Sequence, residues 1–223
     1  MDKDTLKSVV EEVRRSIVRI SFLWKPELVD REPEECMIIA GIIVSIDPDG
    51  SAKIIANPVF FKKSKNFSVR FPNDGGYEEP SVVSSSLVSD LSTDLSTFSL
   101  KPRTAGYIKP VKFEIGDPRK CKPVYAFVFP REEYVTPVGF TEGKIIDSTG
   151  VREENVRFFL HNCAMHEYGF LGSPVFTKRG HLVGISYLDR GYVQAWGVYQ
   201  LQHGPLSKFH GISYVLDGAP LMP

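Results

Sequence analysis

Cysteine is scarce in this sequence, which limits the ways in which the fold can be held together. Only 3 of the 223 residues are cysteines, namely Cys36, Cys121 and Cys163. An odd number of thiols, placed far apart in the chain, argues against a disulfide framework. We therefore expect an intracellular protein of a reducing compartment, in the cytoplasm or the nucleus, with an organelle also open.

The chain also lacks a surplus of charge and a long apolar run. Lysine plus arginine number 27, as do aspartate plus glutamate, so the formal net charge is +0. Such a balance gives no general field that would draw the chain to nucleic acid or to an anionic membrane. No run of about 18 apolar residues is present to cross a bilayer, and the first residues lack the apolar core of a secretory signal. We expect a soluble protein with neither a nucleic-acid nor a membrane partner.

What the chain does have is many short segments of β type. Residues 16–22 alternate and are rich in β-branched side chains, and the pattern repeats at 37–46 and 52–61 around a turn-like Asp-Pro-Asp-Gly at 47–50. Before them, apolar residues recur at helical spacing over 4–15, which predicts a short amphipathic helix. Further strands are expected at 67–71, 95–100, 111–113, 123–129, 139–146, 156–162, 173–176, 181–187 and 192–199. Short strands at this spacing favour an all-β barrel or sandwich.

Between these segments the sequence predicts a loop, a linker and a short tail. Residues 81–93 are rich in serine and aspartate and are expected to form a loop. Residues 101–106, Lys-Pro-Arg-Thr-Ala-Gly, are the best candidate for a linker between two halves of the chain. After the last expected strand, residues 200–223 are enough for a short closing helix or tail around 206–216.

One loop in the second half carries the most specific pattern. Residues 169–175 read Gly-Phe-Leu-Gly-Ser-Pro-Val. They resemble the nucleophile loop of trypsin-like serine proteases, in which a polar residue and the reactive serine stand between the two glycines. Here Phe170 and Leu171 occupy those two positions, so the frame of the loop is present and its nucleophile is not.

Other segments resemble, in order, landmarks of the Deg/HtrA-type branch of this family over roughly residues 16–199. The sequence Ile-Ile-Ala-Asn-Pro-Val-Phe-Phe at 54–61 falls where the family has its catalytic histidine, and Val59 takes the place of that histidine. A later Thr-Asp-Leu-Ser is similar to the segment of the orienting aspartate, which puts Asp94 at the one retained position. The resemblance thus identifies Val59, Asp94 and Leu171 as degenerate triad positions.

The resemblance implies an all-β fold of two packed antiparallel β-barrels, with the active cleft between them and a short helix in front. We expect the helix over residues 1–15, the first barrel over 16–105, the second barrel over 106–206 and a C-terminal helix or tail over 207–223. No cofactor is expected.

The degenerate triad positions lack the groups that acyl transfer needs. The reaction requires a hydroxyl nucleophile, an imidazole that takes its proton and a carboxylate that orients the imidazole. Leu171 and Val59 cannot fill the first two roles, and all five histidines lie beyond residue 160, on the wrong half of the chain. Losing the serine or the histidine of such a triad costs on the order of a million-fold in turnover. The sequence therefore predicts that proteolysis is lost.

A rearranged site remains as an alternative, and with it an active serine-type endopeptidase. Ser173 or Cys163 could pair with His166, because a triad is defined by geometry and not by order. Ser173, however, stands two residues after Leu171, where the family itself uses a small residue, and a buried cysteine beside loop histidines explains Cys163 more simply. His161, Cys163 and His166 match no zinc spacing, so no metal site is expected.

A protease shell without a triad can still bind an extended peptide. Trypsin-like proteases hold substrates as extended strands along an exposed edge, and that edge depends on backbone hydrogen bonds more than on the triad. The leading hypothesis is a pseudoprotease that acts as a protein or peptide interaction module. A self-associating structural unit, and hence a homo-oligomer, is a further alternative. The expected binding residues are Phe170, Leu171, Gly172, Ile185, Ser186, Tyr187, Trp196 and Gly197.

Overall fold

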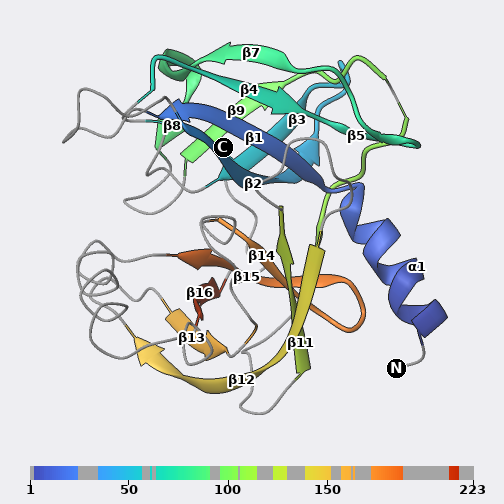
Figure 1. Ribbon diagram of the computed structural model, residues 1–223, viewed down its shortest axis with the longest axis vertical. Helices are drawn as coiled ribbons and strands as arrows, with labels where there is room; N and C mark the ends of the chain where they lie inside the picture. The colour runs from blue at the N-terminus through green and yellow to red at the C-terminus, as the bar shows by residue number, and fades with distance from the viewer. Residues whose placement is uncertain are drawn as a thin grey trace. The chain divides into compact units, whose positions relative to one another are not determined.

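The computed structural model divides the chain into two compact units (Figure 1). The N-terminal unit comprises Asp2–Val111 and Phe129–Val138, and the C-terminal unit comprises Lys112–Val128 and Gly139–Pro223. The division therefore falls after Val111, later than the expected boundary at residue 105. The structure describes residues 3–24, 35–56, 61, 64–90, 96–104, 106–114, 123–129, 139–151, 157–161, 163, 172–187 and 211–215.

Helix α1 (Lys3–Arg14) begins the N-terminal unit, as the helical spacing of its apolar residues predicts. Val13 is buried, whereas Glu11 and Glu12 on the other side are exposed. Arg14 stands in the last turn, where a positive charge suits the negative end of the helix dipole. No helix in the described part of the chain has the length and apolar character that crossing a membrane requires.

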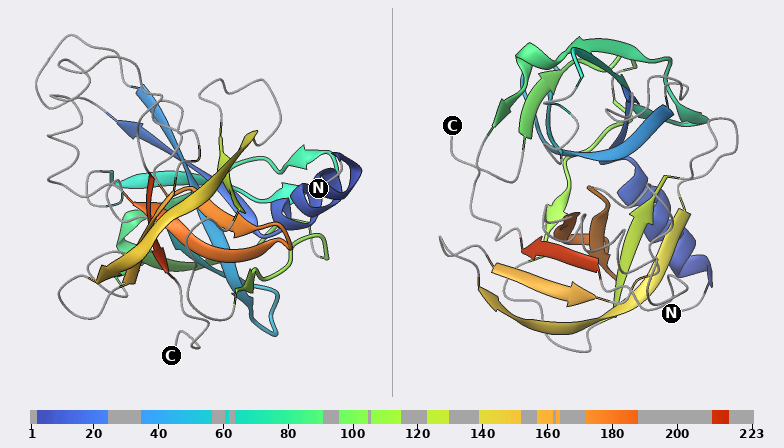
Figure 2. Two further views of the ribbon diagram at one scale, coloured as in Figure 1. Left: turned by 90° about the horizontal axis from the view of Figure 1, so that it is seen from below. Right: turned by 60° about the vertical axis from the view of Figure 1, so that its left-hand side comes forward.

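An antiparallel seven-stranded sheet forms the body of the N-terminal unit. Its strands are β1 (Ile17–Trp24), β2 (Glu35–Ile46), β3 (Ala52–Ala56), β4 (Asn66–Arg70), β7 (Ser81–Ser84), β8 (Ser89–Asp90) and β9 (Ser96–Leu100), and β5 (Pro72–Asn73) and β6 (Gly76–Tyr77) form a separate hairpin. The order in the sheet is β7-β4-β1-β2-β3-β9-β8. The two outermost strands, β7 and β8, are separated along the chain only by the short helix η1 (Ser85–Leu87) and Val88. The sheet is therefore strongly curved, as Figure 2 shows.

Branched and aromatic side chains fill the interior of this unit. Three isoleucines lie side by side across β1, β2 and β3, because Ile42 pairs with Ile17 on one side and with Ile55 on the other. All three are fully buried, and full burial of such a side chain contributes about 1.5–3 kcal/mol. Four further rings pack against one another with centroids 4.8 to 5.9 Å apart, namely Phe22, Phe61, Phe67 and Phe98.

The predicted hairpin turn at residues 47–50 connects β2 and β3. Gly50 has a φ of 85°, a conformation that glycine adopts without steric cost. The carboxylate of Asp49 accepts hydrogen bonds from the backbone N–H of Ser51 at 2.8 Å and from its hydroxyl at 2.9 Å. These bonds lower the pKa of Asp49, the backbone bond most of all.

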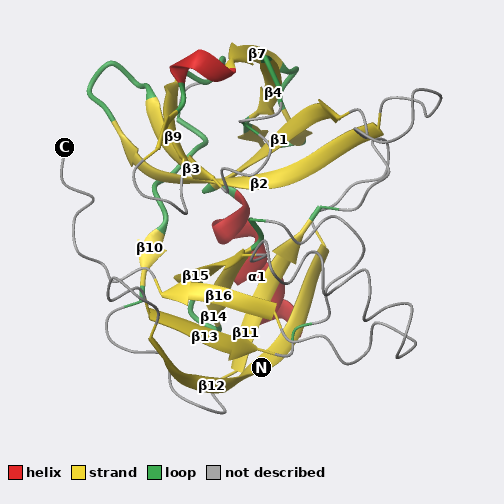
Figure 3. Ribbon diagram, turned by 90° about the vertical axis from the view of Figure 1, so that its left-hand side faces the viewer, coloured by secondary structure: helices red, strands yellow, loops and turns green. Residues whose placement is uncertain are grey.

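The C-terminal unit consists of strands alone within its described residues (Figure 3). They are β10 (Lys112–Phe113), β11 (Pro123–Val128), β12 (Gly139–Val151), β13 (Arg157–His161), β14 (Pro174–Thr177), β15 (His181–Tyr187) and β16 (Gly211–Val215). The order is β10-β15-β14-β11-β12-β13-β16, and β16 also pairs with β15. Pairing therefore runs in a closed circuit from β15 through β14, β11, β12, β13 and β16 back to β15. Its interior contains Val124, Ala126, Ile145, Cys163, Val175 and Val183.

Two expectations from the sequence are corrected by these elements. The C-terminal helix or tail expected over 207–223 contains the strand β16, because its alternating β-branched and aromatic residues pair on both edges. The loop expected over 81–93 contains β7, η1 and β8. There β7 pairs with β4, and Val83 packs inward with 4% exposure. The strand expected over 192–199 lies outside the described residues.

Gly41 in β2 is a position where the packing leaves no room for a side chain. A Cβ there would lie 2.7 Å from Cδ1 of Ile20, 2.7 Å from Cγ2 of Val18 and 2.9 Å from Cγ2 of Ile54. We expect Gly41→Ala to lower the free energy of unfolding by about 1–3 kcal/mol through overpacking, as measured by urea unfolding. Gly75→Ala is the matched control, because its Cβ would meet nothing nearer than 4.0 Å, and it should change stability by less than about 0.5 kcal/mol. Equal stability of the two variants would contradict this account of the packing.

Candidate functional site

The loop that resembles the protease nucleophile loop leads into β14 through Gly172 and Ser173. Gly172 is buried and has a φ of 79°, which favours glycine at this position. Pro174, the first residue of β14, pairs with Ile185 of β15. The structure therefore brings the end of this loop beside the strand expected to bind peptide, so that Gly172, Ser173 and Ile185 lie close together.

The side chains of Ser173 and Ile185 both face the interior. Ser173 is 0% exposed and Ile185 is 2% exposed. A nucleophilic hydroxyl has to reach a substrate carbonyl, and a hydroxyl without any exposed surface does not do so in this conformation. The burial of Ser173 argues against it as an alternative nucleophile. The backbone of Ile185 lies between Pro174 of β14 and Tyr214 of β16, with which it pairs.

Strand β15 differs in its two edges near this loop. On one edge, β16 pairs with it as far as Tyr187, where Tyr187 lies opposite Ile212. On the other edge, β14 pairs with it only as far as Ile185. Within the described part of the chain, the last two residues of β15, Ser186 and Tyr187, thus extend beyond β14. Both residues belong to the expected binding edge. Their backbone lies near Gly172, at the end of the loop that precedes β14.

Cys163 and His161 are buried in the interior of the C-terminal unit, and His161 lies at the end of β13 rather than in a loop. The Nδ1 atom of His161 accepts a hydrogen bond from the backbone N–H of Cys163 at 3.3 Å. The Sγ atom of Cys163 donates to the carbonyl of Val124 at 3.7 Å, and burial raises the pKa of the thiol to about 12. A thiol with this pKa is protonated at neutral pH and is a poor nucleophile. The geometry favours a core cysteine over a rearranged pair with His166.

Gly143 shows how closely the backbone approaches Cys163. A Cβ on Gly143 would lie 2.5 Å from the backbone nitrogen of Cys163 and 2.7 Å from its Sγ. Because backbone atoms cannot rotate away as a side chain can, Cys163 is fixed against β12. The position is part of the core, and a substrate would not reach it without separating two strands.

Several predicted site residues lie outside the described residues. They are Val59, Asp94, His166, Phe170, Leu171, Trp196 and Gly197. The degenerate triad and the apolar cleft around it therefore stay predictions. Among the residues that the structure does describe, no group of three or more histidine, cysteine, aspartate or glutamate side chains is placed to hold a metal ion.

Two polar contacts of the structure were not indicated by the sequence. The Nδ1 of His181 lies 3.2 Å from the Oε2 of Glu114 and ties the residue after β10 to the start of β15. The buried carboxylate of Glu78 accepts hydrogen bonds from the backbone N–H groups of Arg103 at 2.9 Å and Thr104 at 2.6 Å. Both contacts join residues far apart in the chain, and neither belongs to a sequence motif that could have revealed it.

The chain is similar in structure to solved proteases of the HtrA and Deg type, and its fold is that of the trypsin-like serine proteases. A serine-to-alanine mutant of Rv3671c from M. tuberculosis H37Rv, in its inactive form, is 15% identical with a TM-score of 0.58, and the match covers 96% of this chain and 88% of that chain. Deg5 is 13% identical with a TM-score of 0.60, over 92% of this chain and 98% of Deg5. A variant of the HtrA-type protease AlgW, solved with a tripeptide, is 13% identical with a TM-score of 0.63. That match covers 94% of this chain but only 59% of the AlgW chain.

At these identities the likeness establishes the fold alone. The predicted resemblance to trypsin-like proteases is confirmed at that level. No protein-family model matches the sequence, and no curated protein matches it.

Cys163 should resist thiol reagents as long as the protein is folded. In a Cys36→Ser/Cys121→Ser background, we expect iodoacetamide at pH 8 to modify the remaining thiol at least about a hundredfold more slowly than after unfolding in urea. The physical reason is the raised pKa of the buried thiol together with its lack of exposed surface. Mass spectrometry of the intact chain over time gives both rates. Similar rates in the folded and unfolded chain would show that Cys163 is accessible and would revive it as a candidate nucleophile.

Proposed function

We propose that this chain is a catalytically inactive relative of the trypsin-like serine proteases and acts as a protein or peptide interaction module. The observation that carries the proposal is the sequence resemblance, in which Leu171 and Val59 take the nucleophile and base positions of the family. Neither side chain can take part in proton transfer or nucleophilic attack. A free, buried thiol at Cys163 is consistent with a reducing compartment inside the cell.

The two-barrel arrangement of those proteases is part of the proposal. The closed circuit of strand pairs supports a barrel in the C-terminal unit. In the N-terminal unit, β7 and β8 end the sheet on opposite sides and yet are joined by one short helix and Val88. This connection supports the curling of the first sheet into a second barrel.

The proposed binding mode is the addition of an extended segment to the backbone of β15. The stretch at Ser186 and Tyr187 continues beyond β14, so a partner strand can pair there without displacing a strand of the circuit. The AlgW variant of the same fold was solved with a tripeptide, which makes peptide recognition by this fold a reasonable basis for the proposal.

The described residues argue against an active endopeptidase and favour self-association. An active endopeptidase would need Ser173 or Cys163, and both are buried with 0% exposure. Self-association is favoured by two large apolar side chains on the surface of the N-terminal unit, Val82 at 73% and Leu87 at 66% exposure. We keep self-association as the second candidate function.

A serine-reactive fluorophosphonate probe should leave the chain unlabelled under conditions in which an active HtrA-type protease is labelled fully. Leu171→Ser should remain unlabelled as well, at least about ten-thousandfold below the active control, because Val59 supplies no base for the new hydroxyl. Fluorescence of the intact protein after gel electrophoresis reads out both results. Labelling of the wild-type chain that disappears in Ser173→Ala would overturn the proposal that catalysis is lost.

Binding of extended peptides should depend on the apolar residue in the former nucleophile position. For peptides selected by display on the wild-type chain, we expect Leu171→Asp to weaken binding by about tenfold or more, because a carboxylate would have to be desolvated in an apolar site. Fluorescence anisotropy with labelled peptides gives the dissociation constants. Leu87→Asp makes the same chemical change at an exposed position of the other unit and should leave binding unchanged. Equal effects of the two variants, or no selected peptide at all, would contradict a peptide site at this loop.

A further inference from the structure

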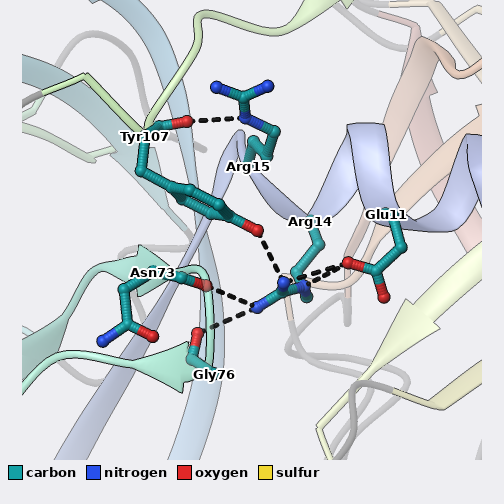
Figure 4. Close-up of polar contacts among 6 residues, drawn as sticks. All are labelled: Glu11, Arg14, Arg15, Asn73, Gly76 and Tyr107. Carbon is teal, nitrogen blue, oxygen red and sulfur yellow. Dashed lines mark hydrogen bonds and ion pairs between the residues drawn. The ribbon is translucent and has the colours of Figure 1, made fainter.

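Polar contacts of Arg14 hold the last turn of α1 to the N-terminal unit (Figure 4). Its Nη1 donates to the backbone carbonyls of Asn73 and Gly76, at 3.0 Å each, and so reaches both strands of the β5–β6 hairpin. Its Nη2 donates to the hydroxyl of Tyr107 at 2.6 Å, and its Nε donates to Glu11 at 3.0 Å. The side chain of Arg14 is only 11% exposed, so water competes little for these bonds.

Arg15, the next residue, holds the segment that leads out of the N-terminal unit. We call residues 106–111 the connecting segment. The Nε of Arg15 donates to the carbonyl of Tyr107 at 2.6 Å, and its Nη2 donates to the carbonyl of Gly106 at 3.4 Å. Both guanidinium groups also lie over the Tyr107 ring, 4.9 Å from its centroid for Arg15 and 5.5 Å for Arg14. The backbone carbonyl of Arg15 accepts a further bond from the N–H of Lys109 at 3.0 Å.

The connecting segment ends at the division between the two units, which falls after Val111. The N–H of Val111 donates to the carbonyl of Ile43 in β2 at 2.8 Å, and Ile108 and Val111 are each 7% exposed. Each part of the segment is therefore held either by the end of α1 or by β2. The contacts with α1 come first along the chain, at Gly106, Tyr107 and Lys109.

The rest of α1 is held less firmly than its last turn. Among the described side chains of the helix, Val13 is the only buried apolar one, and Leu6, Val9 and Val10 are half-buried. A helix of 12 residues is marginally stable in water by itself. Arg14 in its last turn and Arg15 directly after it therefore contribute to the docking of α1, and the same two groups hold the connecting segment.

We propose that α1 acts as a latch on the connecting segment. With its last turn docked, Arg14 and Arg15 keep residues 106–111 on the N-terminal unit. When α1 is withdrawn, Gly106, Tyr107 and Lys109 lose these contacts, and the segment stays attached to β2 through Val111. The coupling is reciprocal by thermodynamic linkage, so a factor that loosens the connecting segment also loosens α1. This regulatory role is independent of whether the chain binds peptides.

The latch can be tested by hydrogen exchange and mass spectrometry on the full chain. In Arg15→Ala, we expect the amides of Tyr107, Ile108, Lys109 and Val111 to exchange about tenfold faster than in the wild type, because two charge-assisted bonds to the backbone are lost. In Tyr107→Phe, which removes only a hydroxyl, the amides of the last turn of α1 should exchange faster by several-fold. Lys7→Ala is the matched control, since Lys7 is an exposed helix residue without a role in the latch, and it should leave the connecting segment unchanged.

Two results would overturn the latch. Unchanged exchange of residues 107–111 in Arg15→Ala would show that the arginine does not hold the segment. Exchange that rises equally in β1, β2 and β3 would show that Arg15 supports the whole unit and not the segment in particular. Tyr107→Phe separates these cases, because the reciprocal effect on α1 is expected only if the two elements are coupled. Cleavage after residue 107 by chymotrypsin should rise in parallel in Arg15→Ala and gives an independent readout.

Discussion

The pairing of both edges of β16 is the constraint on which the C-terminal unit depends. An open sheet edge leaves backbone N–H and C=O groups without partners, and β16 removes two such edges at once by pairing with β13 and with β15. β16 pairs with one side of β15, and β14 pairs with the other side only as far as Ile185, so within the described residues the end of β15 next to Gly172 extends beyond β14. The pairing of β16 with β15 thus determines which edge of β15 is used in the proposed peptide site.

Most strands could be predicted because their side chains alternate or are rich in β-branched residues. Residues 181–187, for example, were expected as a strand and form β15 (His181–Tyr187). The strands β7 and β16 could not be predicted in the same way. β7 consists of two valines between serines, and β16 lies where a closing helix or tail was expected, so each is recognised as a strand from the neighbours with which it pairs.

The candidate site could be predicted in part. The family resemblance located the loop before β14 and the strand β15 beside it, and the expectation of a buried Cys163 agrees with its 0% exposure. The contacts of Arg14 and Arg15 could not be predicted. Their acceptors are mainly backbone carbonyls, which carry no sequence signature, and apart from Glu11 the partners of Arg14 lie 59 to 93 residues away along the chain.

The distance between α1 and its anchor also matters during synthesis. Arg14 leaves the ribosome long before Tyr107, which follows 93 residues later. At translation rates of about 5–20 residues per second, the helix waits roughly 5–20 s before the residue that fixes it has been made. For that time α1 is an amphipathic segment without the tyrosine to which Arg14 later donates.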